Sequence, residues 1–404
     1  MKYIILVFFI FQSLSELSAS DKKLIDVSGE FRTLYDYGKT RNGMAAGGHI
    51  AVTYSFLETL SAKVAVYSSQ PVLGSDSGLR GTGLFEEHNG FNILGEANVK
   101  YQGKNTSITI GRQSLNSPLV TSHDAIMIPG LFSGINILKQ VTDTATIKFM
   151  YLDEMSGRDN LHKKSEWLSM SKVLGASYSQ GMYSVGLSNS SKAKNETDKI
   201  KSELWYYHIP DTLNTYYASH SMPIAKTDYR IESHYWRSYS EKTFELDTNK
   251  NIDYYFIGAQ ISKDINNFTF KFAYDRMDKK DDSFTIPKAF GNYAIYTYGL
   301  RLDAGAYGAN IAGSGLEIRN MNAIKFTSII KLEKHSIFLV GYMIGRSSDS
   351  SLQSDMNLLD IAWFSGEVFG KQSSLGVILE NLQANSGGVF KSDTKLKLIY
   401  KYRF

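Results

Sequence analysis

The chain ends in the stretch that decides its fold, Thr394-Lys-Leu-Lys-Leu-Ile-Tyr-Lys-Tyr-Arg-Phe404. Every second residue from Leu396 to Phe404 is aliphatic or aromatic, and all but one of the residues between them are lysine or arginine. An alternation with a period of two residues is typical of a β-strand with one apolar and one polar face. The sequence therefore predicts that the chain closes on an amphipathic strand.

The same alternation recurs upstream, where Phe268, Phe270, Phe272 and Tyr274 share one predicted face. Residues 50–56, 91–101, 145–151 and 324–332 repeat the pattern. No Pro-rich or Gly/Ser-rich linker divides the region from Leu24 to Phe404. Short turns alternate with long polar connections. A spacing of about 21 residues per strand and connection predicts about 18 strands.

The composition excludes several classes of protein. A mean hydropathy of −0.23 excludes a membrane protein made of many helices. The 404 residues contain no cysteine, which excludes disulfides, a cysteine nucleophile and a cysteine-ligated metal. The net charge of +4 is far below that of a nucleic-acid-binding protein, so no nucleic-acid partner is expected.

The first 20 residues have the layout of a secretory signal peptide. Lys2 precedes the apolar run Tyr3 to Phe11, and Ser18-Ala19-Ser20 offers small residues for cleavage. The run is too short to span a membrane as a helix. We expect residues 1–20 to be a signal peptide and residues 21–404 to form one domain.

Export, tyrosine-rich strands and alternating short and long connections are typical of an outer-membrane barrel. A soluble all-β protein such as a propeller or a β-helix would show the same alternation. It would need neither a signal peptide nor strands that end in aromatic residues. We therefore predict an all-β transmembrane antiparallel β-barrel in the bacterial outer membrane, in contact with its lipid. Phe404 resembles the C-terminal insertion signal read by the outer-membrane insertion machinery.

If the apolar face of each strand meets lipid, the opposite face lines a channel. Basic side chains outnumber acidic ones on that face, which would favour anions, although neighbouring acids could neutralise many of them. The basic candidates, most of them expected near mid-strand, are Arg32, Lys148, Arg230, Lys271, Lys325 and Lys331. The acidic candidates are Glu30, Glu96, Glu232 and Asp275.

One segment resembles a known family. Gly111-Arg-Gln-Ser-Leu-Asn-Ser-Pro-Leu119, followed by residues 122–130 and Phe132-Ser-Gly134, is similar to the third loop of OprD-type porins, especially those of Campylobacterota. The resemblance implies an 18-stranded barrel whose third extracellular loop folds into the lumen and constricts it. It departs from the family at residues 125–127, which are apolar where the family often has arginine. The matching constriction-loop positions are Arg112, Gln113, Pro118, Asp124, Pro129 and Phe132.

The predicted function is diffusion of small hydrophilic solutes or ions, with a basic lumen that favours anionic or carboxylate-bearing solutes. No cofactor is expected, and the eight scattered histidines show no metal-ligand spacing. A surface adhesin or binding barrel and a barrel enzyme remain as alternatives. A plugged, energy-coupled transporter would need more strands and a plug domain. The sequence allows either a monomer or a homotrimer.

Overall fold

The structure is a computed structural model. It describes residues 24–38, 41–72, 89–122, 126–157, 165–192, 199–225, 227–280, 290, 296–297, 304–305, 308–311, 316–318, 321–333, 335–347, 355–368, 370, 372–386 and 388–404.

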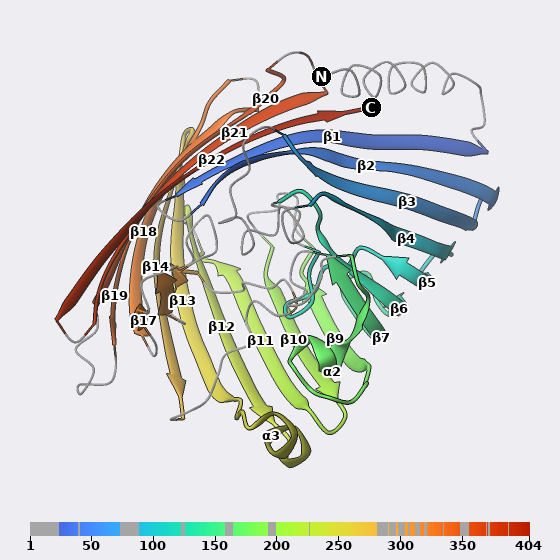
Figure 1. Ribbon diagram of the computed structural model, residues 1–404, viewed down its shortest axis with the longest axis horizontal. Helices are drawn as coiled ribbons and strands as arrows, with labels where there is room; N and C mark the ends of the chain where they lie inside the picture. The colour runs from blue at the N-terminus through green and yellow to red at the C-terminus, as the bar shows by residue number, and fades with distance from the viewer. Residues whose placement is uncertain are drawn as a thin grey trace.

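Eighteen antiparallel strands close into one barrel, in which each strand pairs with the next along the chain (Figure 1). The last strand, β22 (Val389–Arg403), pairs with the first, β1 (Ile25–Gly38), and closes the ring. The strands between them are β2 (Arg41–Leu57), β3 (Leu60–Pro71), β4 (Phe91–Gln102), β5 (Thr106–Gln113), β6 (Gly130–Gln140), β7 (Ala145–Gly157), β9 (Met182–Ser190), β10 (Lys201–Ile209), β11 (Leu213–Pro223), β12 (Tyr229–Ser240), β13 (Asp253–Ile265), β14 (Phe268–Lys279), β18 (Met321–Lys331), β19 (Ile337–Ser347), β20 (Asp355–Gly366) and β21 (Ser373–Ser386). The predicted barrel and strand number are confirmed.

The remaining described elements are short and lie in the connections. Beside β7 lie β8 (Leu168–Ser169) and α2 (Met170–Val173), and α3 (Lys242–Thr248) follows β12. A separate small sheet contains β15 (Ala304–Gly305), β16 (Gly308–Ile311) and β17 (Leu316–Ile318). None of the helices in the described part of the chain is long and apolar enough to cross a membrane.

The connections fix the orientation of the barrel. Those after β2, β4, β6 and β13 are short turns, and the described ends of the chain lie at the same rim. The connections after β3, β5, β7 and β14 are long and leave the barrel at the other rim. In outer-membrane barrels short turns face the periplasm and long loops face the exterior. The rim that carries Ile25 and Arg403 is therefore periplasmic.

Burial separates two faces of each strand. Val52, Tyr54 and Phe56 alternate along β2 and are 40–51% exposed on the isolated chain. On β1, Glu30 and Arg32 are only 3% and 2% exposed. Exposed apolar side chains at alternating positions form the band that bilayer lipid covers, and the buried polar face is the lumenal one.

A β-bulge corrects one expectation from the sequence. Alternate residues from position 91 to 101 were predicted to share a face, but Gly95 is an extra residue that has no partner in the register between β3 and β4. Phe91 and Ile93 are buried, whereas Val99 and Tyr101 are more than 40% exposed. One inserted residue exchanges the two faces of a strand, so the prediction was wrong beyond the bulge.

The seam between the first and last strands is closed by the terminal residue. Gly29 and Phe404 exchange two backbone hydrogen bonds of 3.1 Å, directly after the end of β22. A Cβ atom at position 29 would lie 2.3 Å from the Phe404 ring. The ring therefore needs a residue without a side chain opposite it.

The lumenal face is not polar along its whole length. A cluster of buried apolar side chains includes Met321, Met343, Met356 and Leu358 near the exterior ends of neighbouring strands. Eight of the 12 methionines of the chain belong to it. Methionine adapts its shape to irregular gaps. It therefore suits the place where side chains of the connections pack against the lumenal side of the strands. The assignment of all apolar faces to lipid was wrong for this part of the barrel.

Candidate functional site: the lumen

Glu30 is the centre of a buried charge cluster at the barrel seam. Its carboxylate forms an ion pair with Arg32, the neighbour two residues along the same strand. Across the seam, the Arg403 Nε atom lies 2.9 Å and the Lys401 Nζ atom 3.8 Å from the same carboxylate. Three cations around one buried carboxylate hold the closing strands together.

Lys325 lies in a second buried pair. Its Nζ atom is 2.5 Å from Oδ2 of Asp360, and both side chains are at most 5% exposed. The pair spans the intervening strand at Gly341, where an added Cβ atom would lie 2.9 Å from Lys325 Cε. Because Gly341 has no side chain, Lys325 on β18 can reach Asp360 on β20. The positive charge of Lys325 is therefore offset within the wall.

Glu96 lies on β4, directly after the bulge. Its carboxylate accepts hydrogen bonds from Lys63 Nζ at 2.9 Å and from Tyr67 Oη at 2.7 Å. Lys63 is 35% exposed, whereas Glu96 is buried. The bulge turns Glu96 toward the lumen beside these partners.

Asp275 holds the long connection after β14 against the wall. Its Oδ2 atom accepts a hydrogen bond of 2.6 Å from the Thr297 amide, and its Oδ1 atom lies 3.2 Å from His234 Nε2. The ring of Tyr296 lies 4.5 Å from the His234 ring, centroid to centroid. Burial, with the negative charge of Glu232 nearby, raises the pKa of Tyr296 well above its usual value, so its phenol stays neutral. Tyr296 and Thr297 of this connection therefore contact β12 and β14 near the middle of the barrel.

Arg230 and Glu232 occupy the periplasmic half of β12. Arg230 Nε donates a 2.7 Å hydrogen bond to Ser221 Oγ and lies 3.8 Å from Glu232. Ser221 Oγ in turn donates to Glu232 at 3.2 Å, and Gln260 also donates to this carboxylate. The two predicted lining residues are thus brought together with a serine of the next strand.

Three predicted basic residues are less enclosed. Lys148 Nζ lies 5.6 Å above the ring of Trp205, and Lys271 is half-buried on β14. Lys271 has no ion-pair partner within the described residues. Lys331 is the last residue of β18, 59% exposed and 3.9 Å from Asp264. The expected mid-strand position is wrong for Lys331, and for Arg230, the second residue of β12, because the turns begin closer to them than the alternation indicated.

The charge balance of the buried wall differs from that of the predicted lining. Eight acidic residues are buried in the described chain, against four basic ones. Any excess of positive charge available to a solute must therefore come from partly exposed residues. The buried acids are Glu30, Asp36, Glu96, Asp253, Asp275, Asp360, Glu380 and Asp393, and the buried bases are Arg32, Lys325, Lys395 and Lys397.

Four of these acids, Asp253, Asp360, Glu380 and Asp393, were missed from the sequence, and a signal was present for two of them. Asp360 follows Leu358-Leu359, and Glu380 follows Ile378-Leu379. A single carboxylate inside an otherwise apolar strand is costly unless it is paired, so each one marks a lumenal position with a partner.

Hydrogen bonds fix the two ends of the segment between β5 and β6. The side-chain amide of Gln113 is buried and donates to the carbonyl oxygens of Gly111 at 3.2 Å and Gly134 at 3.3 Å. Arg112 lies with its guanidinium 4.4 Å above the ring of Trp167, and donates to the Leu94 carbonyl. These contacts join the start of the segment to neighbouring strands.

Within the segment, residues 114–122 form a tight turn. Leu115 N donates to Ser122 Oγ at 2.9 Å, and Ser122 N donates back to the Leu115 carbonyl at 2.7 Å. Pro118 is half-buried, whereas Pro129 and Phe132 are fully buried. Asp124 lies outside the described residues.

Three contacts tie this segment to distant parts of the chain. Arg32 Nη1 donates to the Ile126 carbonyl. Tyr207 Oη donates to Ser117 Oγ at 3.1 Å and accepts from the Leu119 amide at 3.2 Å. The Thr121 amide also donates to the Phe290 carbonyl at 3.0 Å. Side chains of β1 and β10 and the connection after β14 all contact one segment.

No group of three or more metal-ligating side chains comes together in the part of the chain that the structure describes. The lumen instead presents fixed carboxylates, ammonium groups, guanidinium groups and hydroxyls. Such groups can attract, orient and release polar solutes.

A closed antiparallel barrel with an apolar outer band and a charged lumenal wall defines an outer-membrane channel for small solutes. A family model for the outer membrane porins of the OprD family matches residues 84–310, more than half of the chain. The chain belongs to this family, whose members are channels rather than enzymes. The predicted membership of the OprD family is thereby confirmed, and the chain is placed in the bacterial outer membrane, in contact with its lipid.

Solved structures show the same fold. Pseudomonas aeruginosa OccK9 (OpdG) has 15% sequence identity and a TM-score of 0.73, over 94% of this chain and 98% of that one. Acinetobacter baumannii OccAB3 has 11% identity and a TM-score of 0.73, over 94% and 99%. Pseudomonas aeruginosa OpdK, solved with vanillate, has 13% identity and a TM-score of 0.70, over 94% and 98%. A comparison with curated protein sequences gave no match.

Proposed function

We propose that this porin passes small hydrophilic solutes through a lumen narrowed by residues 114–129, and that it favours anionic or carboxylate-bearing solutes. The observation that carries the first part is the pair of tethers from Arg32 and Tyr207. Arg32 belongs to β1 and Tyr207 to β10, which is eight strands away in one direction and ten in the other. Described residues of one segment thus contact side chains on opposite walls, which supports a path of the segment across the lumen.

A thiol introduced into the segment tests this crossing, since the chain has no cysteine of its own. Ser117→Cys would place a thiol next to Tyr207. A charged thiol reagent added to the open channel is expected to change its current, because the new group would stand in the solute path. Thr59→Cys, an exposed position in the turn between β2 and β3, is the control. Reaction of Ser117→Cys without any change in current would contradict the proposal.

The proposed preference for anions depends on Lys148 and Lys271. Arg32 and Lys325 are buried in ion pairs, whereas these two lysines are only partly buried on strands of the barrel wall. A unit charge 4 Å from a passing ion contributes about 4 kcal/mol at an effective dielectric constant of 20. Salt and nearby acids screen most of this, which leaves a several-fold preference.

Lys148→Gln combined with Lys271→Gln is therefore expected to shift the reversal potential in a salt gradient toward cations. Lys331→Gln at the rim, where Asp264 offsets the charge, is the matched control and should shift it less. An unchanged reversal potential in the double variant would contradict the proposed preference for anions, but not the proposed channel.

Three further expectations belong to the same proposal. Residues 1–20 act as a cleaved signal peptide, and residues 21–404 form the single barrel domain. Phe404 serves as the signal for the insertion machinery, which its position at the closing seam supports. The barrel acts without catalysis, and membership of a porin family favours this over the adhesin and barrel-enzyme alternatives. Native gel migration after detergent extraction distinguishes a monomer from a homotrimer.

A further inference from the structure

A polar depression lies on the lumenal wall in the periplasmic half of the barrel. Its volume is about 420 Å³, and β10, β11 and β12 supply most of its lining. None of the predictions from the sequence joined these three strands into one site. The lining residues are Lys201, Glu203, Tyr217, Ser219, His220, Ser221, Arg230, Glu232 and Tyr296.

The strand register explains why this part of the wall is hollow. Ser221 pairs with Lys201 on one side and with Glu232 on the other, so these three residues form one row across the strands. In the next row, Ser219 pairs with Glu203. Neighbouring strands lie about 4.8 Å apart, so the two charged side chains of the first row rise about 10 Å apart with a short serine between them.

The charges in this hollow form an ordered set along the barrel. On β10, Lys201 lies one row nearer the periplasm than Glu203. On β12, Arg230 likewise lies nearer the periplasm than Glu232. Both outer strands therefore present a cation toward the periplasm and a carboxylate toward the middle of the barrel.

Aromatic surface completes the hollow on the side away from the periplasm. Tyr217 occupies the row above Ser219, with its ring 5.7 Å from that of Trp236. Tyr296 comes from the connection after β14 and lies near Glu232. The cavity thus has a cationic side, an acidic side and an apolar flank, a combination that the proposed preference for anions does not require.

We propose that this hollow binds a zwitterionic solute with a flat apolar group, on its way between the constriction and the periplasm. Lys201 and Arg230 receive its carboxylate, and Glu203 and Glu232 receive its ammonium group. Its apolar group lies against Tyr296. Hydrogen bonds between ionised partners are short and strong, and aromatic side chains prefer flat partners. The inference rests on the proposed function, because the solute must first enter through the channel.

The test uses three probes that share a phenyl group and differ in their charged groups: phenylalanine, 3-phenylpropanoate, which lacks the ammonium group, and 2-phenylethylamine, which lacks the carboxylate. Each is added to the periplasmic side of single channels in a planar bilayer, and interruptions of the ion current are counted. Phenylalanine is expected to interrupt the current at a lower concentration than either analogue. This ranking needs no variant, so it does not depend on how a substitution folds.

The combined variant Glu203→Gln and Glu232→Gln then removes the site for the ammonium group. It is expected to raise the half-effective phenylalanine concentration by about tenfold, equivalent to about 1.4 kcal/mol, and to change the effect of 3-phenylpropanoate little. Heat-modifiable gel migration confirms that the variant is folded.

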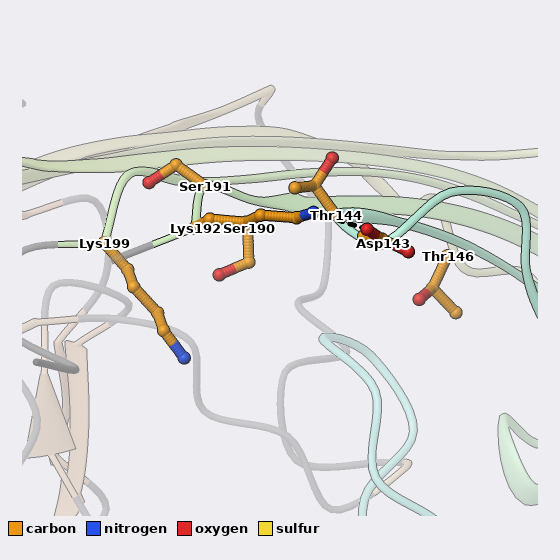
Figure 2. A pocket seen from close by; sticks show the side chains of 7 residues that line it. All are labelled: Asp143, Thr144, Thr146, Ser190, Ser191, Lys192 and Lys199. Carbon is orange, nitrogen blue, oxygen red and sulfur yellow. Dashed lines mark hydrogen bonds and ion pairs between the residues drawn. The ribbon is translucent and has the colours of Figure 1, made fainter. Parts of the chain in front are cut away.

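A matched control lies at the same rim of the barrel. Asp143 and Lys192 form an ion pair beside a neighbouring hollow of about 630 Å³, and both side chains are at least 70% exposed. Figure 2 shows Lys192 reaching toward Asp143, while Lys199 points away from the pair. Asp143→Asn combined with Lys192→Gln removes one acid and one base, and is expected to leave the effect of phenylalanine unchanged.

Two results would overturn the proposed zwitterion site without contradicting the porin function. One is an equal effect of the three probes, and the other is an unchanged phenylalanine effect in the Glu203→Gln and Glu232→Gln variant. Absence of any channel from the unmodified chain would overturn the porin function, and the proposed site with it.

Discussion

Replacing Tyr207 by phenylalanine removes one hydroxyl from the lumenal wall and should loosen the segment between β5 and β6. The hydroxyl donates to Ser117 Oγ at 3.1 Å and accepts from the Leu119 amide at 3.2 Å. Tyr207 and Leu119 are fully buried, so water does not readily replace the lost partner. The ring itself stays, stacked 5.5 Å from Trp205, so packing is preserved.

A buried amide that loses its hydrogen-bond partner costs about 1–3 kcal/mol. A value of about 2 kcal/mol lowers the ratio of seated to displaced segment by about thirtyfold. Single-channel recording should therefore show brief openings of high conductance that are about thirty times more frequent in Tyr207→Phe than in the unmodified channel.

Tyr206→Phe is the control, because its hydroxyl lies on the same strand but donates to Asn214 Oδ1 and not to the segment. Identical records from Tyr207→Phe and the unmodified channel would refute the reasoning. So would an equal effect of Tyr206→Phe, since that would trace the change to the strand and not to the tether.

Gly29→Val places a side chain where the Phe404 ring lies, and should reduce the fraction of chains that assemble into a heat-modifiable barrel. Normal assembly of this variant would contradict the proposed seam. Asp360→Asn removes the charge that faces the buried ammonium group of Lys325, and should destabilise the barrel by about 3–5 kcal/mol, measured as a lower temperature for the gel shift, with no shift counting against the pairing. Hydrogen bonds from the hydroxyl and then the backbone amide of Ser177 hold the pKa of Asp247 below its usual value. This contact is therefore present above the usual carboxyl pKa and is lost as the pH falls through the lowered one. Hydrogen exchange at the Ser177 amide, corrected for its intrinsic rate, should speed up in acid, and Asp247→Asn should speed it up at neutral pH.

Much of the barrel could be predicted because its information is local. A strand that alternates between lipid and lumen needs only its own residues to specify which face is which. The terminal strand, with Leu396 to Phe404 on one face, is the clearest example, and its pairing with β1 follows from closure. The strand number could also be predicted, because the length of each strand and connection is a local feature of the sequence. Dividing the chain length by their regular spacing gives the number of strands.

The features that were missed depend on contacts between distant residues. The bulge at Gly95 shifts the register by one residue, and nothing in the alternation marks it except a glycine. The inward methionines, such as Met343, were not predicted, because the side chains that bury them inside the barrel are distant in sequence. Their one local trace is the apolar run from Ile337 to Ile344, in which both faces of the strand are apolar.

The lining residues show the same limit. Lys325 was predicted to face the lumen, and the alternation supports that face. Its pairing with Asp360 depends on two strands that approach across Gly341, which no pattern within one strand reveals. The hollow around Ser221 likewise exists only in the register of three strands. Sequence therefore identified candidate charges but not which of them a solute can reach.

Single-channel conductance of a chain that lacks residues 116–128 tests the central claim most directly. The deletion removes the segment that Arg32 and Tyr207 tether, and leaves all 18 barrel strands in place. If this segment narrows the lumen, the shortened and correctly folded channel should conduct more current than the unmodified one under the same salt and voltage. Equal conductance of the two channels would contradict the claim.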